Sequence, residues 1–114
     1  MKLPIKILYA EDERLFREMI TDFLKDLVDE VYVADSGSSG LQVFRQKGAD
    51  LVVADIAMPG MSGLKMIESI KKIKPSVKTI ITTSYEETNY FIDAIEIGVD
   101  KFLLKPFDRN ILSK

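Results

Sequence analysis

The chain has 114 residues, of which 46% are hydrophobic and 30% charged, a balance typical of one folded domain and not of a disordered segment. Sixteen basic and eighteen acidic residues give a net charge of −2, so nothing indicates a basic surface for nucleic acid. The absence of Cys and His excludes disulfides, thiolate chemistry and a histidine base or metal ligand within this chain. No apolar run approaches the roughly 18 residues of a membrane helix or resembles a signal peptide, and we expect a cytoplasmic domain.

Apolar runs and amphipathic segments alternate along the chain. Strands are expected at about 5–10, 31–34, 51–54, 78–82 and 101–104, and helices at about 13–27, 37–47, 62–74 and 84–97. Gly48, Pro75 and Gly98 are expected to end the second, third and fourth helices. The first helix carries a broad apolar stripe that we expect to face the core: Leu15, Phe16, Met19, Ile20, Phe23, Leu24 and Leu27.

Strand–helix alternation of this kind predicts a parallel sheet with right-handed connections and helices on both faces. We expect one α/β domain over residues 1–114, a flavodoxin-like (βα)5 doubly wound sandwich with strand order 2-1-3-4-5. Asp108 is placed to begin a last helix, which is truncated because the sequence stops at Lys114. That truncation predicts that the domain is the N-terminal part of a longer protein.

Polar side chains follow four of the apolar strands. The run Leu51–Ala54 ends at Asp55, and Glu11 and Asp12 follow the first strand. Thr83 follows the fourth strand and Lys105 the fifth. Because the carboxyl ends of parallel strands meet at one edge of a sheet, where ligands bind in this class of fold, these residues are expected to lie together.

The types of residue at this edge point to phosphoryl chemistry. Glu11, Asp12 and Asp55 would repel one another unless a cation or shifted pKa values compensated. Oxygen ligands with room for water suit Mg²⁺. Lys105 supplies a point charge for a phosphoryl oxygen and Thr83 a hydroxyl donor, beside Asp55 as a carboxylate nucleophile. Each residue alone is also consistent with an ordinary solvated strand end; the combination favours a site.

The same residues carry a resemblance to a known family. From about residue 5 to 107 the chain resembles the receiver domain of bacterial two-component response regulators. The matching positions are Glu11-Asp12, Asp55 to Pro59 with Gly63, Thr83, Phe102 and Lys105-Pro106. The resemblance implies that a histidine kinase or phosphotransfer protein phosphorylates Asp55. The domain would then catalyse only its own phosphorylation and dephosphorylation.

The resemblance also implies a metal site. Asp12, Asp55 and the backbone carbonyl of Ala57 would bind Mg²⁺ directly. Glu11 stands where Asp is commoner, and its longer side chain would act through a metal-bound water. The bond between Lys105 and Pro106 would be cis.

Two further properties follow from the resemblance. Phosphorylation would draw Thr83 toward the phosphoryl group and let Phe102 turn inward. The surface of the fourth helix, fifth strand and fifth helix would change, and a dimer can form through it. Ala57 and Tyr85 would flank the path of the hydrolytic water, and their lack of a well-placed base predicts a long-lived phosphorylated form. No direct contact with nucleic acid or membrane is expected.

Two alternatives stay open. A stand-alone phosphatase with an Asp nucleophile would normally carry a second acid where Ala57 stands. A receiver-like interaction module that is never phosphorylated would usually have lost Asp55 or Lys105. A nucleotide-binding domain is disfavoured because no Gly-rich loop follows the first strand.

Overall fold

The structure is a computed structural model, and it describes residues 2–83 and 91–104. Strands and helices alternate along these residues. They are β1 (Leu3–Ala10), α1 (Arg14–Leu27), β2 (Val28–Ala34), α2 (Gly37–Lys47), β3 (Leu51–Asp55), α3 (Gly63–Ile73), β4 (Lys78–Thr83), α4 (Phe91–Ile97) and β5 (Lys101–Leu104). The predicted starts of the fourth and last helices lie outside the described residues.

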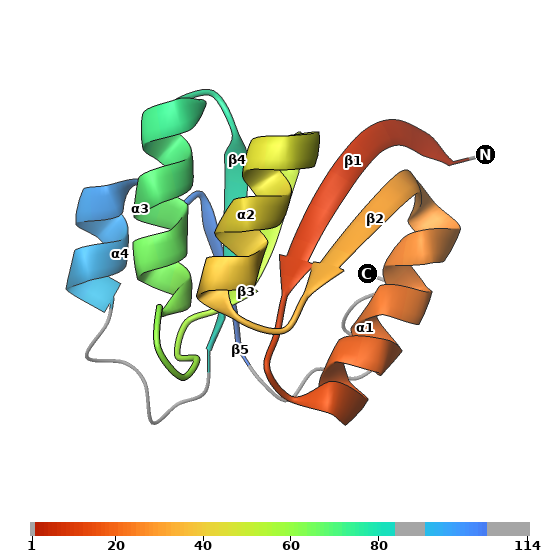
Figure 1. The fold of residues 1–114 in the computed structure, drawn as a ribbon, viewed down its shortest axis with the longest axis horizontal. Coiled ribbons are helices and arrows are strands. Elements are labelled where there is room, and N and C mark those ends of the chain that lie inside the picture. Colours follow the sequence, from red (N-terminus) through yellow and green to blue (C-terminus); the bar gives the residue numbers. More distant parts are fainter. Residues whose placement is uncertain (1, 84–90, 105–114) are drawn as a thin grey trace.

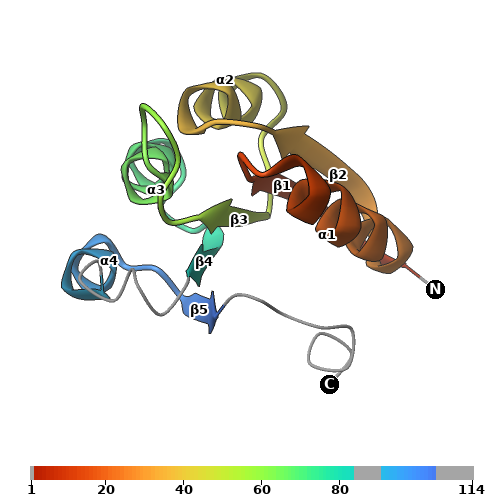
Figure 2. The ribbon, with the colours of Figure 1, turned by 90° about the horizontal axis from the view of Figure 1, so that it is seen from below.

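The strands form one parallel sheet in the order β2-β1-β3-β4-β5, so the predicted doubly wound α/β fold is confirmed. Helices α2, α3 and α4 lie on one face, and α1 lies on the other (Figures 1 and 2). The chain passes from β1 outward to β2 and then back across β1 to β3. The carboxyl ends of β1 and β3 are therefore neighbours at the point where the strand order reverses.

The sheet is buried on both faces, each with its own apolar cluster. Leu8 and Ala10 of β1 pack toward α2 and α3, while Ile7 and Tyr9 pack in the cluster that includes Ile20 of α1. In β3, the side chains of residues 52, 53 and 54 are 0%, 6% and 0% exposed. The short apolar run before Asp55 is thus a central strand, as its composition predicts.

The helix ends agree with the sequence signals. Ser36 and Ser62 cap α2 and α3, accepting hydrogen bonds from the backbone N–H of Ser39 at 3.1 Å and of Lys65 at 3.2 Å. Gly48 and Gly98, at φ 69° and 91°, follow α2 and α4 as expected. The third helix ends at Ile73, just before Pro75.

Two expectations about α1 and β2 were wrong. The second strand begins at Val28 and not at 31, because α1 passes into it directly and Val28 pairs with Leu3. Asp29 and Glu30 are charged, so the sequence gives no apolar strand signal at the start of β2. The apolar stripe of α1 is also wider than the side that the sheet covers. Its buried member is Ile20, whereas Leu15, Met19 and Leu27 are 76%, 45% and 43% exposed.

Asp100 joins the turn between α4 and β5 to the start of β4. Its carboxylate accepts hydrogen bonds from the backbone N–H of Thr79 at 2.8 Å and from its hydroxyl at 3.2 Å. Burial pushes the pKa of Asp100 upward, but the Thr79 hydrogen bonds, with help from Lys71 and Lys78, outweigh burial and leave the pKa below its ordinary value. The charged form therefore stabilises the fold.

We expect Asp100→Asn to lower the free energy of unfolding at neutral pH. A lowered folded-state pKa gives stability that is present above the ordinary pKa and is lost as the pH falls through the lowered value. The deficit of the variant should therefore shrink in acid. Urea unfolding at several pH values measures it, with Asp22→Asn, at an exposed position of α1, as control. A deficit that is equal at all pH values would contradict the role of the charge.

Candidate functional site

Three carboxylates meet at the carboxyl ends of β1 and β3. One oxygen each of Glu11, Asp12 and Asp55 lies within 4.8 Å of the others. Glu11 is 0% and Asp55 6% exposed, while Asp12 reaches solvent. The register explains the meeting, because Ala10 pairs with Ala54 and the next residue of each strand is an acid. The sequence prediction that these three residues lie together is thus matched by the geometry.

Backbone hydrogen bonds hold the loops that carry these acids. Glu11 donates its N–H to the carbonyl of Ala34 at the end of β2, at 3.0 Å. Beyond Asp55, the N–H of Ile56 binds the carbonyl of Thr82 at 2.9 Å. The Glu11 carboxylate also accepts the N–H of Glu13 at 3.2 Å, just before α1 begins. The carboxylates are therefore presented from restrained backbone.

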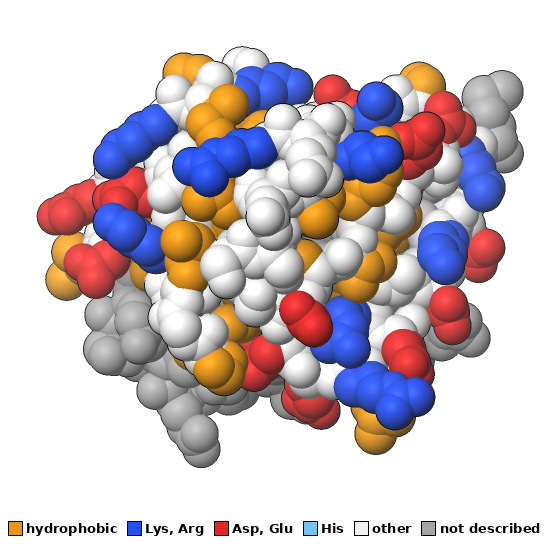
Figure 3. Space-filling model, in the orientation of Figure 1, with side chains coloured by type: hydrophobic (Ala, Val, Ile, Leu, Met, Phe, Trp, Pro, Cys, Tyr) orange, Lys and Arg blue, Asp and Glu red, His pale blue; other side chains and the backbone are white. Residues whose placement is uncertain are grey.

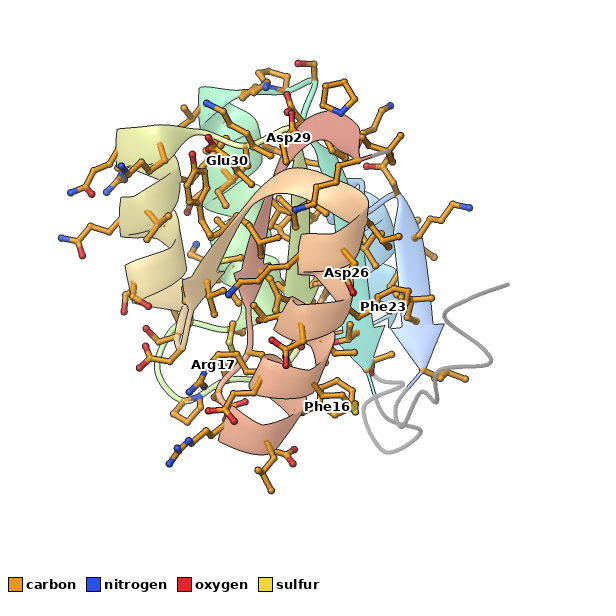
Figure 4. The ribbon with its side chains drawn as sticks, turned by 90° about the vertical axis from the view of Figure 1, so that its right-hand side faces the viewer. Phe16, Arg17, Phe23, Asp26, Asp29 and Glu30 are labelled. Atoms are coloured by element: carbon orange, nitrogen blue, oxygen red, sulfur yellow. The ribbon has the colours of Figure 1, made fainter. Side chains whose placement is uncertain are left out.

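Arg17 on α1 ties the loop between β1 and α1. Its guanidinium donates to the carbonyl oxygens of Glu11, at 2.9 Å, and Asp12, at 3.4 Å. Figure 4 shows Arg17 at the end of α1 where this loop enters the helix. Sequence reasoning missed this residue, since a long flexible side chain gives no periodic signal. Its place in the first turns of a helix that follows an acidic loop is the one available clue.

Gly63, the first residue of α3, packs against the backbone of Asp55. A Cβ at this position would lie 2.0 Å from the Asp55 carbonyl oxygen. The Gly63 N–H donates to the carbonyl of Ile56 at 3.1 Å. The start of α3 thus packs directly against the end of β3, which carries Asp55.

The structure describes some of the other predicted site residues. Thr83 ends β4, is 0% exposed and directly follows Thr82, which pairs with Asp55. Phe102 of β5 is half-buried and pairs with Ile81, so it lies on the face of the sheet that Thr83 also shares. Ala57 lies two residues beyond Asp55 and is half-buried. Lys105, Pro106 and Tyr85 lie outside the described residues.

The donor set fits a hard divalent cation. Carboxylate oxygens at this spacing, without thiolate or imidazole in the chain, suit Mg²⁺ better than zinc or copper. The two buried acids can face the ion from the protein side. The exposed Asp12 leaves room for the water that Mg²⁺ retains.

The fold and this acidic edge define a class of protein, the doubly wound α/β domains of the CheY-like receiver type. The model of the response regulator receiver domain family matches residues 7–114, and the chain belongs to that family. It is 33% identical to the chemotaxis protein CheY of Bacillus subtilis over 92% of this chain and 88% of that protein. It is 32% identical to the response regulator protein VraR of Staphylococcus saprophyticus, covering 90% of this chain but 50% of that relative.

Solved structures agree. A response regulator receiver domain protein from Clostridium thermocellum superimposes with a TM-score of 0.86 at 34% identity, covering 97% of this chain and 89% of that one. The N-terminal domain of a protein from Wolinella succinogenes gives 0.87 at 35% identity, covering 96% and 88%. The chain therefore spans nearly all of some relatives and about half of VraR. Among the described residues, no helix is long and apolar enough to cross a bilayer.

Proposed function

We propose that this chain is a phosphoacceptor domain and that Asp55 receives the phosphoryl group. The observation that carries the proposal is the cluster of Glu11, Asp12 and Asp55, with oxygens within 4.8 Å of one another at the switch point of a receiver fold. A nucleophilic carboxylate needs neighbours that hold a cation opposite it. Glu11 and Asp12 are such neighbours.

In the proposed reaction, an Asp55 oxygen attacks phosphorus while the bond from phosphorus to the donor breaks. The donor nitrogen of a phosphohistidine, or the acetate of acetyl phosphate, leaves with the bonding electrons. Mg²⁺, when bound, would supply positive charge that offsets the negative charge of the transferred group. Asp12 and the Ala57 carbonyl would hold the ion with Asp55, and Glu11 would act through a metal-bound water. Lys105 and Thr83 would contact the phosphoryl oxygens.

A histidine kinase or phosphotransfer protein is the proposed donor, in the cytoplasm. The readout is proposed to be a switch of the surface formed by α4, β5 and the segment after it, driven by Thr83 and Phe102 and able to support dimerisation. The shared sheet face of Thr83 and Phe102 supports this coupling. Basic and acidic side chains both lie on the face in Figure 3, and we propose no direct contact of this domain with nucleic acid.

The proposed phosphorylated form is long-lived. Ala57, two residues past Asp55, carries only a methyl group and cannot orient a hydrolytic water. Tyr85 is proposed to cover the other side of the approach. A lasting signal suits a regulatory domain that is not an independent enzyme.

Acetyl phosphate treatment tests the proposal. We expect wild-type protein with Mg²⁺ to gain the mass of one phosphoryl group in intact-mass spectrometry. Asp55→Asn should gain none, and excess chelator should block the gain. Asp35→Asn is the matched control, because Asp35 also follows a strand but lies outside the acidic cluster.

The outcomes separate the alternatives. A stand-alone phosphatase would consume acetyl phosphate continuously without a persistent mass gain, and an interaction module would neither gain mass nor consume it. Equal labelling of Asp55→Asn and wild type would exclude Asp55 as the acceptor.

A further inference from the structure

Tyr9 is a buried phenol beneath the acidic cluster. Its side chain is 0% exposed. Alternation along β1 puts it on the same sheet face as Glu11, two residues later. It pairs with Val53 of β3, and Asp55 follows Val53 at the same two-residue spacing. Tyr9 thus stands in the row of the sheet directly below the two buried carboxylates.

The ring of Tyr9 belongs to the apolar cluster on the α1 face, together with Ile7, Ile20, Val28 and Val53. Its hydroxyl has no hydrogen bond of ordinary length within the described part of the chain. A buried hydroxyl without a partner is costly, and a phenylalanine would fill the same apolar space without that cost. The hydroxyl therefore calls for a partner at the polar end of the ring.

The geometry identifies that partner, because Glu11 and Asp55 follow Tyr9 and Val53 on the same face of the sheet. Burial raises the pKa of the Tyr9 phenol far above its ordinary value, and the charges of Glu11 and Asp55 raise it further. A weak interaction with the Glu11 carboxylate contributes in the same direction, while the Arg17 guanidinium opposes it. A phenol can donate a hydrogen bond and a carboxylate can only accept one, so the position of Tyr9 makes it a donor toward Glu11.

The Glu11 carboxylate is the group that such a donor would orient. Its backbone is held on both sides, by the Ala34 carbonyl and by Arg17. The Glu13 N–H reaches one carboxylate oxygen, Oε2. Glutamate has one more rotatable bond than aspartate, so its carboxylate has more positions to lose when it is fixed. A donor on the sheet beneath the carboxylate would restrict those positions.

We propose that Tyr9 is a positioning residue of the metal site: its hydroxyl donates to the Glu11 carboxylate and orients it toward the bound cation. The inference rests on the proposed function, because that function places a Mg²⁺ ion beside Glu11. Tyr9 does not touch the cation or the phosphoryl group. It acts through Glu11, as outer-shell hydrogen bonds do at other metal sites.

Calorimetric titration of Mg²⁺ into Tyr9→Phe, without any phosphodonor, tests this role. We expect the affinity to fall roughly tenfold, the lower end of what loss of an outer-shell partner costs. Tyr32→Phe is the matched control, because the Tyr32 hydroxyl also donates to a carboxylate, that of Glu30, on an exposed part of β2. Its Mg²⁺ affinity should equal that of wild type.

A double-mutant cycle with Glu11→Asp separates positioning from a general structural role. The shorter side chain withdraws the carboxylate from the phenol, so Tyr9→Phe should change Mg²⁺ affinity little in that background. An equal loss in both backgrounds, or no loss in either, would overturn the inference. Failure of wild type to bind Mg²⁺ would overturn the proposed metal site itself, and with it this role.

A measurement on wild type needs no variant. The ring resonances of Tyr9 should shift when Mg²⁺ saturates the protein, while those of Tyr32 should not. Unshifted Tyr9 resonances at saturation would count against the proposed contact.

Discussion

Replacing Gly63 by alanine is expected to lower the free energy of unfolding by about 3 kcal/mol and to displace Asp55. The new methyl group would lie 2.0 Å from the carbonyl oxygen of Asp55 and 2.9 Å from its carbonyl carbon. These are backbone atoms of a central strand, so they cannot move aside as a side chain can. Either α3 or the end of β3 must shift, and the acidic cluster shifts with it.

Gly40→Ala is the matched control, with the same added methyl group inside α2. There the new Cβ would lie 2.5 Å from Sδ of Met66, which belongs to a flexible side chain. Alanine also favours a helix interior over glycine by about 1 kcal/mol. The two effects oppose each other, and we expect the free energy of unfolding to change by no more than about 1 kcal/mol. Urea unfolding followed by circular dichroism compares both variants. Equal stability of the two would show that the backbone contact at Gly63 is not what matters.

The central strands and the helix boundaries could be predicted because their signals are local. The apolar run before Asp55 and the caps at Ser36 and Ser62 depend on residues close in sequence. The start of β2 could not, because Val28 joins the sheet by pairing with Leu3, far away in the chain. The exposed side of α1 likewise depends on how much of the helix the sheet covers.

Some features of the site could likewise be predicted from the sequence, and others could not. Parallel strands bring their carboxyl ends to one edge, so the meeting of Glu11, Asp12 and Asp55 followed from topology alone. The contact between the Arg17 guanidinium and the Glu11 carbonyl depends on the rotamers of a long side chain, which the sequence does not specify. Tyr9 was detectable in principle. In a buried strand, a phenol two residues before an acid lies on the same face, so alternation alone makes the two side chains neighbours.

The acidic cluster also sets the response to metal. We expect Mg²⁺ at about 100 times its dissociation constant to stabilise wild type by about 2.7 kcal/mol, because the folded protein alone presents the assembled site. Asp12→Asn should lose most of that gain. Its oxygen lies within 4.8 Å of those of Glu11 and Asp55, and an amide brings no charge to the ion. The loss of affinity should exceed the roughly 10–100-fold that an outer-shell change costs.

Thermal unfolding with and without Mg²⁺ measures this, and Asp35→Asn again serves as control because its carboxylate binds the Ser39 hydroxyl outside the cluster. Asp12 is the informative member for this test, since it is exposed and its substitution leaves the buried pair in place. Two carboxylates remain in the variant, Glu11 and Asp55. If they alone hold the ion, Asp12→Asn will keep the full wild-type gain in stability, and Asp12 is then not a ligand. If the gain is lost while Asp35→Asn retains it, the third carboxylate is what makes the edge of this sheet a magnesium site.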